Sequence, residues 1–192
     1  MLLRRGGRHS DRGVEVLMAR RSDVASFMPG IWVFPGAAID AGETPAQCAA
    51  RELVEETGVD LGEDPDLLAW SRWITPEVVP VRFDTHFLVG LAPPHSSPKA
   101  DEAEISEVAW WAPRAALDAH ADGQLSLVFP TIKTLETLLR FANADEVMAA
   151  APGDRVEPIL PRVTGTRKNH RVLLPTDEGY DEAADNPGEL PV

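Results

Sequence analysis

Three glutamates on one stretch of predicted helix constrain this chain more than any other feature of its sequence. Glu52, Glu55 and Glu56 occur within the run RELVEE, at positions i, i+3 and i+4. A helix turns about 100° per residue, so the three side chains share one face. Carboxylates at this spacing repel one another by roughly a few tenths of a kcal/mol for each pair. The pattern indicates a site for a hard divalent cation, Mg²⁺ or Mn²⁺, because these ions prefer oxygen ligands.

The same residues also have an ordinary structural interpretation, which is a solvated acidic helix face. Arg51 and Glu55 lie four residues apart, the spacing of a common ion pair on helix surfaces. The run RELVEE alone does not decide between the two interpretations. The residues around it favour the metal site.

Both ends of this helix are marked in the sequence. Thr44 and Gln47 have the T-x-x-Q spacing of a capping box, and Pro45 suits the first helical turn. Gly58 supplies a stop signal at the other end. We therefore predict a helix between Thr44 and Gly58, with its carboxylates toward a cleft. The apolar face that docks on a sheet consists of Ala46, Ala49, Ala50 and Leu53.

Residues 35–59 resemble the signature of the Nudix hydrolases, GX5EX7REUXEEXGU, in which U is an aliphatic residue. Glu43 and the run from Arg51 to Val59 match every fixed position after the first glycine. Ala37 stands where the signature has that glycine. If the loop needs a positive φ there, alanine costs on the order of 1 kcal/mol that glycine does not.

The resemblance implies a fold and a reaction. The fold is an α/β/α sandwich with a mixed, partly antiparallel sheet, and the signature forms a loop-helix-loop on one side. The reaction is metal-dependent hydrolysis of a diphosphate that links a nucleoside to another group. A homodimer is common in this superfamily, but no stretch of the sequence indicates an interface.

The resemblance also implies roles for individual residues. Arg51 orients the glutamates and pairs with Glu43. The implied metal ligands are the carboxylates of Glu52, Glu55 and Glu56 and the backbone carbonyl of Ala37, with Glu52 and Glu56 the surest pair.

The base that activates the attacking water varies within the superfamily. Glu56 is our first choice, and Glu104 and Glu102 are the second. A carboxylate beside a cation stays ionised at neutral pH and can accept a proton from water that the metal acidifies. The alternative for Glu102 and Glu104 is a charged edge strand.

The segment before the signature indicates which class of substrate is favoured. The run LMARRS, Gly30 and the run FPG resemble the corresponding segment of coenzyme A diphosphatases. Two later runs, WITP and RFDTHF, resemble a branch that includes peroxisomal acyl-coenzyme A enzymes. Arg20 and Arg21 are then candidate contacts for phosphate or 3′-phosphoadenosine, since guanidinium groups suit phosphate oxygens, or they form a solvated strand end.

Several substrates and one other class of function stay open. Coenzyme A or an acyl derivative is the favoured substrate. ADP-ribose, NADH, nucleotide sugars and dinucleoside polyphosphates are the alternatives. The second class is a Nudix-fold module that binds a nucleotide without hydrolysing it.

Composition limits the partners and the location. The net charge of −13 argues against binding to nucleic acid or to an anionic membrane, since both depend on clustered Lys and Arg. The single cysteine, Cys48, has no internal disulfide partner and is predicted to be a small buried residue. The sequence shows neither a secretory signal nor an apolar run near the ~18 residues of a membrane helix, so a cytoplasmic location is expected.

The chain is expected to form one domain over residues 1–175, followed by a flexible acidic tail at residues 176–192. This tail has six acidic residues and neither Lys nor Arg. A polar turn is predicted at residues 6–13. Strands are predicted at residues 1–5, 14–20, 31–34, 67–74, 82–91 and 105–111, helices at 113–123, 131–142 and 145–151, and a hairpin from 158–163 and 171–175.

Overall fold

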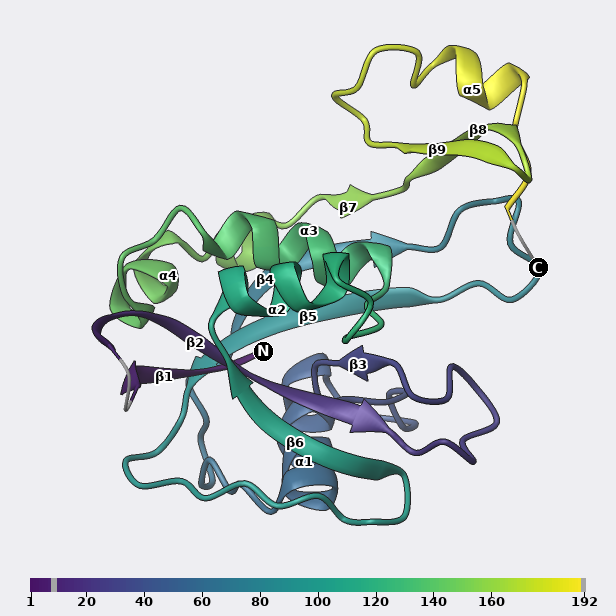
Figure 1. Ribbon diagram of the computed structural model, residues 1–192. Coiled ribbons are helices and arrows are strands. Elements are labelled where there is room, and N and C mark those ends of the chain that lie inside the picture. The colour runs from purple at the N-terminus through teal and green to yellow at the C-terminus, as the bar shows by residue number, and fades with distance from the viewer. Residues whose placement is uncertain (8–9, 191–192) are drawn as a thin grey trace. The chain divides into compact units, whose positions relative to one another are not determined.

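Groups of strands are separated by helices along the chain, as the computed structural model shows (Figure 1). The structure describes residues 1–7 and 10–190, and only the backbone at residues 6, 7 and 10–12. The strands are β1 (Leu2–Gly7), β2 (Ser10–Arg21), β3 (Trp32–Val33), β4 (Leu68–Ile74), β5 (Asp84–Leu91), β6 (Ile105–Trp111), β7 (Pro158–Ile159), β8 (Arg162–Thr166) and β9 (Asn169–Leu173). The helices are α1 (Pro45–Thr57), α2 (Pro113–Ala121), α3 (Phe129–Leu138), α4 (Ala144–Ala150), the short 3₁₀ turn η1 (Gly153–Arg155) and α5 (Glu182–Asp185).

The main sheet is mixed, as predicted. Its hydrogen-bonded order is β3-β2-β1-β5-β4-β7, and β6 pairs with β2. Strand β2 is antiparallel to β1, β3 and β6, whereas β1 is parallel to β5 and β4 is parallel to β7. Strand β2 pairs with three other strands, and its last residues lie beside the start of β6.

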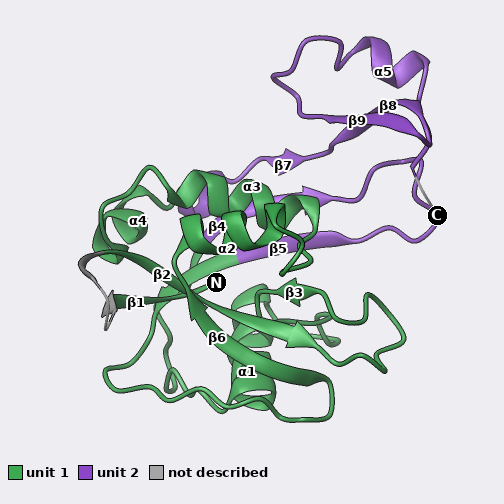
Figure 2. Ribbon diagram, viewed as in Figure 1, with its two compact units in different colours: residues 1–68, 88–151 green, residues 69–87, 152–192 purple. Residues whose placement is uncertain are grey.

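The chain divides into two compact units (Figure 2). Unit 1 comprises residues 1–68 and 88–151, and unit 2 comprises residues 69–87 and the segment from residue 152 onward. Helix α1 and the strands that carry the other predicted site residues all belong to unit 1. The single domain over residues 1–175 stays a prediction.

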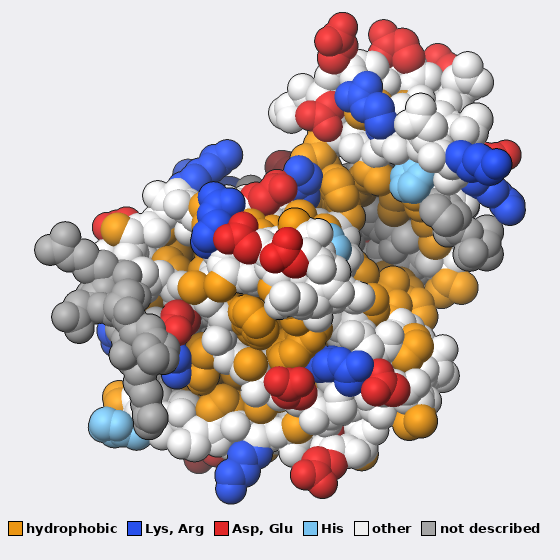
Figure 3. Space-filling model, in the orientation of Figure 1, with side chains coloured by type: hydrophobic (Ala, Val, Ile, Leu, Met, Phe, Trp, Pro, Cys, Tyr) orange, Lys and Arg blue, Asp and Glu red, His pale blue; other side chains and the backbone are white. Residues whose placement is uncertain are grey.

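Unit 1 has helices on both faces of its sheet (Figure 1). Leu53 of α1 packs with Leu2, Leu17 and Val59 in a buried cluster on one face. Each such leucine contributes about 1.5–3 kcal/mol through its burial. On the other side α2 and α3 pack together, and α4 packs against β1 and β2. Hydrophobic side chains still reach the surface between α2 and β6 (Figure 3), as on most proteins.

Unit 2 contains a two-stranded hairpin whose boundaries correct a prediction. β8 and β9 pair antiparallel from Arg162↔Leu173 to Thr166↔Asn169. The sequence predicts a single strand over 158–163, but residues 158–159 form β7 and pair with β4 instead. Pro161 lies between the two strands and has no N–H for a ladder, which explains the break.

The C-terminal segment is in contact with this hairpin. Gly188 N donates to Val163 O at 2.7 Å, and Glu189 N donates to Gly165 O at 3.1 Å. The Arg162 guanidinium lies over the ring of Tyr180, 4.0 Å from its centroid. The flexibility that we predict for this segment stays a prediction.

Other predicted boundaries also differ from the structure, most clearly those of the first turn and of α3. The polar turn expected at residues 6–13 is shorter, because β1 continues to Gly7 and β2 begins at Ser10; residues 8 and 9 lie outside the described residues. Helix α3 begins at Phe129, before the predicted start at residue 131, because Pro130 is compatible with the first turn. It ends at Leu138 instead of residue 142, in a turn closed by Phe141 N and Leu138 O at 3.2 Å.

Candidate active site

Helix α1 begins and ends where the sequence predicts. Thr44 Oγ1 accepts from Gln47 N, and Gln47 Oε1 accepts from Thr44 N at 2.9 Å, which completes the capping box. A cap of this kind contributes about 1 kcal/mol. At the other end Gly58 has a φ of 68°, and its N–H donates to Val54 O at 2.8 Å. The helix therefore holds its glutamates in a fixed register.

The three glutamates of α1 differ in their exposure. Glu52 and Glu56 are buried, with 8% and 4% of their surfaces exposed. The side chain of Glu55 is 58% exposed. Glu52 and Glu56 therefore form the inner pair of carboxylates, four residues apart on one face.

Arg51 connects this helix to the loop before it. Its Nε and Nη2 donate to the two carboxylate oxygens of Glu43, at 2.9 and 3.0 Å. Its Nη1 donates to Glu55 at 3.1 Å and also to Glu52. The hydrogen bond from Arg51, together with one from Asp40 N, lowers the pKa of Glu43 to about 2. The structure thus contains the Arg51–Glu43 pair that the family resemblance implies.

Glu56 has the most perturbed carboxylate of α1. Its Oε2 accepts from Gly36 N at 3.0 Å. Burial raises the pKa of Glu56 to about 7, with smaller upward effects from the charges of Glu52 and Glu104. The Gly36 hydrogen bond and the positive charge of Arg21 act in the opposite direction. Sequence reasoning missed the contribution of Gly36, because Gly36 and Glu56 lie twenty positions apart in the chain.

The β2–β6 ladder brings Arg21 and Glu104 to the same end of the sheet. Arg21 pairs with Ile105 in this ladder, and Ser22 N donates to Glu104 O at 2.8 Å. Glu104 therefore comes directly before β6, at the end of β2. Glu102 lies in the turn before it, with a φ of 64°.

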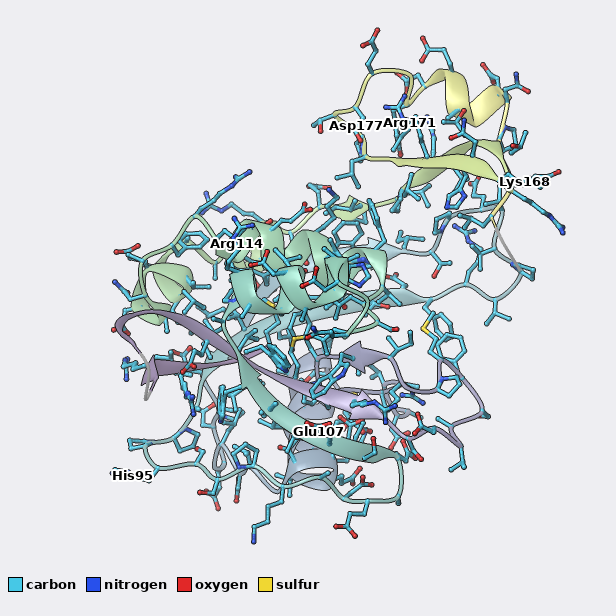
Figure 4. The ribbon with its side chains drawn as sticks, viewed as in Figure 1. His95, Glu107, Arg114, Lys168, Arg171 and Asp177 are labelled. Atoms are coloured by element: carbon cyan, nitrogen blue, oxygen red, sulfur yellow. The ribbon has the colours of Figure 1, made fainter. Side chains whose placement is uncertain are left out.

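Arg20 makes other contacts. Its Nη1 donates to Ser106 Oγ at 3.1 Å, and its Nη2 donates to Asp23 Oδ1 at 2.6 Å. Glu107 of β6 is the cross-strand partner of Arg20 and is labelled in Figure 4. The register of the β2–β6 ladder shifts between Arg20 and Arg21, and the Arg21 side chain donates to a different partner, Phe27 O, at 2.9 Å.

The loop carbonyl of Ala37 lies against α1. Cys48 Sγ is 3.7 Å from Ala37 O and 3.6 Å from Ala38 O, within the range of weak thiol hydrogen bonds. Cys48 is buried, as predicted, and burial raises the pKa of its thiol. No local pattern in the sequence predicts this contact between helix and loop.

Ala37 also escapes the strain considered above. Among the described non-glycine residues, positive φ values occur at Met28, His95 and Glu102. The positive φ values of this loop are instead at Gly36 and Gly42, at 149° and 87°. An alanine at position 37 therefore has no left-handed conformation to adopt.

The comparison with known protein families decides the family. A family model described as the NUDIX domain matches residues 2–129. The chain belongs to the NUDIX family. The match covers α1, β2 and β6, and so every site residue predicted from the sequence.

Two curated relatives of this NUDIX chain are distant in sequence and longer than it. It is 27% identical to "Putative nudix hydrolase 7" of Caenorhabditis elegans, over 77% of this chain and 62% of that protein. It is 28% identical to "NAD-capped RNA hydrolase NudC" of Stutzerimonas stutzeri, over 78% of this chain and 45% of that protein. The chain thus spans about half to two thirds of the length of these relatives.

Solved structures show the NUDIX fold. The Nudix hydrolase of Alicyclobacillus acidocaldarius superposes with a TM-score of 0.68, at 24% identity, over 78% of this chain and 93% of that chain. A mutT/nudix family protein of Listeria innocua superposes with a TM-score of 0.54, at 22% identity, over 73% and 88%. The predicted α/β/α fold is confirmed. None of the helices in the described part of the chain has the length and apolar character needed to span a membrane.

The carboxylates of this NUDIX site suit a hard cation in their chemistry. Divalent cations are typical of the family. Within the described residues, no group of three or more His, Cys, Asp or Glu side chains lies close enough to hold a metal. Arg51 forms ion pairs with both Glu52 and Glu55. The donors are nevertheless all oxygens, and a cation would offset the negative charge that surrounds buried Glu56. The ligand set stays a prediction.

Proposed function

We propose that this chain is a metal-dependent hydrolase of a nucleoside diphosphate linked to another small group. The observation that carries the proposal is the buried pair Glu52 and Glu56 on α1, with Arg21 and Glu104 close enough to act on the Glu56 charge. A buried carboxylate such as that of Glu56 is costly to retain, so its presence favours a role in chemistry.

The proposed roles are those that the family resemblance implies. Water attacks one phosphorus and the other phosphate leaves. Glu52, Glu55 and Glu56, with the Ala37 carbonyl, would hold Mg²⁺ or Mn²⁺, which when bound neutralises the charge of the diphosphate. Arg51 positions the glutamates through its hydrogen bonds.

Two residues are candidates for the base that accepts the proton of the attacking water. Glu56 is the first candidate, because its carboxylate is buried within the cluster. Glu104 is the second, and it is exposed at the start of β6, where water reaches it directly. Arg21 would contact a phosphate oxygen, whereas Arg20 would do so only after release from Asp23.

Coenzyme A or an acyl-coenzyme A is the favoured substrate. The support is the resemblance of residues 17–36 to coenzyme A diphosphatases, together with the position of Arg21 beside the glutamates. ADP-ribose and NADH form the second candidate class. It is favoured by the NAD-capped RNA hydrolase relatives and by a Shewanella oneidensis NrtR domain, solved with ADP ribose, that shares the fold at a TM-score of 0.52. Nucleotide sugars, a non-catalytic binding module, a homodimer and a cytoplasmic location also remain proposals.

The test is turnover of a substrate panel in Mg²⁺ and in Mn²⁺. The panel contains coenzyme A, an acyl-coenzyme A, ADP-ribose, NADH and a nucleotide sugar. Glu56→Gln is the inactivating variant, and Glu63→Gln, in the loop after α1, is the matched control. We expect turnover that requires metal, is lost in Glu56→Gln and is kept in Glu63→Gln. Nucleotide binding without any turnover would instead identify a binding module.

A further inference from the structure

The loop that joins β2 to β3, residues 22–31, contains two residues with left-handed backbone (Figure 1). Met28 has a φ of 49°, and Gly30 has a φ of 70°. This conformation is uncommon for a residue other than glycine, and it persists only where the surrounding structure holds it. Such residues concentrate at binding and active sites, so the role of this segment needs an explanation. We call residues 22–31 the β2–β3 loop.

Arg21, the last residue of β2, is held by this loop through both its backbone and its side chain. Its N–H donates to Ile31 O at 2.9 Å, and its carbonyl accepts from Gly30 N at 3.1 Å. Its side-chain Nε donates to Phe27 O at 2.9 Å. A guanidinium is planar, so the hydrogen bond at Nε fixes the plane in which the two terminal nitrogens lie. The loop therefore determines where the Arg21 N–H groups point.

Gly30 is the residue that the shape of the loop requires. A side chain there would lie 3.2 Å from Asp23 Oδ1 and 3.3 Å from Arg20 Nη2, and these two atoms form an ion pair at 2.6 Å. Its φ of 70° also belongs to the left-handed region that favours glycine. Because Asp23 and Ser106 take up the Arg20 guanidinium, Arg21 is the better placed of the two arginines for a ligand.

Arg21 lies at the carboxylate site. It pairs with Ile105 in the β2–β6 ladder, and Ser22 N donates to Glu104 O at 2.8 Å. The positive charge of Arg21 and the negative charge of Glu104 both act on buried Glu56. An anionic group that binds beside these carboxylates needs cationic donors. A guanidinium suits this task best, because its N–H groups match two oxygens of one phosphate.

We propose that the β2–β3 loop is a positioning element for Arg21. The Phe27 carbonyl and Gly30 orient the guanidinium, and its terminal nitrogens bind one phosphate of the substrate diphosphate. This inference rests on the proposed function, and it adds the residues that orient the phosphate contact. Arg21 is the residue that binds, whereas Phe27 and Gly30 act through it.

A simpler role for Arg21 is to offset the charge of Glu56. Coulomb attraction depends on the distance between two charges and not on the directions of the N–H groups. A residue that only offsets Glu56 would therefore tolerate lysine and would need no hydrogen bond at Nε. The fixed guanidinium favours a ligand with a geometry of its own. The two roles predict different results for Arg21→Lys.

The test measures the affinity for methylenediphosphonate, a diphosphate analogue whose bridging carbon resists hydrolysis, by calorimetry in Mg²⁺. Arg21→Lys keeps the charge but has neither an Nε nor a planar fork. We expect it to bind the analogue about 10-fold more weakly or worse, the usual effect of losing a hydrogen bond to a charged group. Arg114→Lys is the matched control, since Arg114 is exposed on α2 (Figure 4), and it should bind like the wild type.

Gly30→Ala tests the loop itself. It should weaken binding of the analogue in the wild-type background and have no further effect in Arg21→Lys, because it acts through that guanidinium. Gly62→Ala is the matched control for backbone strain, since Gly62 follows α1 with a φ of 84° and has open space for a Cβ. Both alanine variants should lose stability in urea, whereas only Gly30→Ala should lose affinity.

Other results would overturn the inference. Wild-type affinity in Arg21→Lys would show that only the charge matters, and a wild-type protein that does not bind the analogue would have no such phosphate contact. Equal losses from Gly30→Ala in the wild type and in Arg21→Lys would reject an effect through Arg21. If Gly30→Ala does not fold, Arg21→Lys against Arg114→Lys decides, since only the former removes the hydrogen bond to Phe27.

Failure of the inference and failure of the proposed function are distinguishable. Turnover of the substrate panel combined with unchanged affinity in Arg21→Lys would reject the loop and keep the hydrolase. The expected pattern of binding without any turnover would reject the hydrolase and keep the loop.

Discussion

Arg51 contacts both carboxylate oxygens of Glu43, with its Nε at 2.9 Å and its Nη2 at 3.0 Å from them. Glu43 belongs to the loop before α1, and Arg51 belongs to the middle of the helix. The third guanidinium nitrogen donates to Glu55 and Glu52. One planar side chain thus fixes the loop and orients two glutamates, which a lysine with a single ammonium group could not do.

Glu43→Gln should weaken metal binding and turnover by roughly 10- to 100-fold, the usual effect of losing a partner that orients the ligands. The amide keeps the size of the side chain but loses the charge that holds both Arg51 nitrogens. The measurement is the Mg²⁺ dependence of turnover, supported by Mn²⁺ binding to the protein alone.

Asp40→Asn is the matched control for this prediction. Asp40 also lies near Arg51, but its closest contact is 3.8 Å and its side chain is 78% exposed. We expect little change in the metal dependence of this variant. Equal losses in the two variants would mean that general electrostatics, and not the Arg51–Glu43 geometry, sets the affinity.

Glu56 should make the stability of the metal-free protein depend on pH. Its folded-state pKa is about 7, raised by burial from a value of 4.5. The folded protein therefore holds this proton more tightly than the unfolded chain does. The stability linked to the proton is fully present below pH 4.5 and is lost as pH rises to about 7, at a cost of about 3 kcal/mol.

Glu56→Gln should remove this loss, since the amide is neutral and can still accept from Gly36 N. In EDTA at pH 8 the variant should melt several degrees above the wild type, at about 2–4 °C for each kcal/mol, and near pH 4.5 the two should agree. Glu55→Gln, with its exposed side chain, should follow the wild type. Parallel pH profiles for wild type and Glu56→Gln would contradict the prediction.

Local signals explain what the sequence could predict about the site. The capping box of Thr44 and Gln47 and the stop at Gly58 are encoded within a few residues, and α1 follows them at both ends. Glu52 and Glu56 share a face because helical periodicity requires it. In each case the residues that determine the structure are close together in the chain.

The rest of the site depends on contacts between distant segments. Glu104 meets β2 through Ser22, and Gly36 meets Glu56 across twenty positions, so neither contact has a local signal. The different environments of Glu55 and Glu56 depend on which side of α1 the sheet and loop cover. The different hydrogen bonds of Arg20 and Arg21 likewise depend on distant partners, Ser106 of β6 for Arg20 and Phe27 of the loop after β2 for Arg21.

Ala37 and Gly36 form a matched pair for testing the departure from the family signature. Ala37 has no positive φ, so Ala37→Gly should bring no gain in activity and should cost about 0.4–1 kcal/mol through the entropy of the unfolded chain. Gly36 has a φ of 149°, and a Cβ at this position would have no other atom within 4 Å. Gly36→Ala should therefore cost about 1–3 kcal/mol through backbone strain alone.

Urea unfolding and turnover of both variants provide the measurement for this pair. A large gain in activity from Ala37→Gly would show that the loop needs glycine at position 37 after all. An unstrained Gly36→Ala would show that the loop relaxes freely. Either result would contradict the backbone conformation that we describe at positions 36 and 37.

Gly188 tests whether the acidic C-terminal segment is flexible. A side chain at Gly188 would lie 2.4 Å from Thr164 C and 2.7 Å from Gly165 N, and these backbone atoms cannot easily move away. Gly188→Ala should therefore detach the segment from β8 and release the hydrogen bonds of Gly188 and Glu189. Amide exchange at residues 186–190 should become faster, whereas the exposed change Glu178→Ala should leave it unaltered. If exchange is already fast in the wild type, the segment is flexible, as its six acidic residues predict, and the contact with β8 is transient.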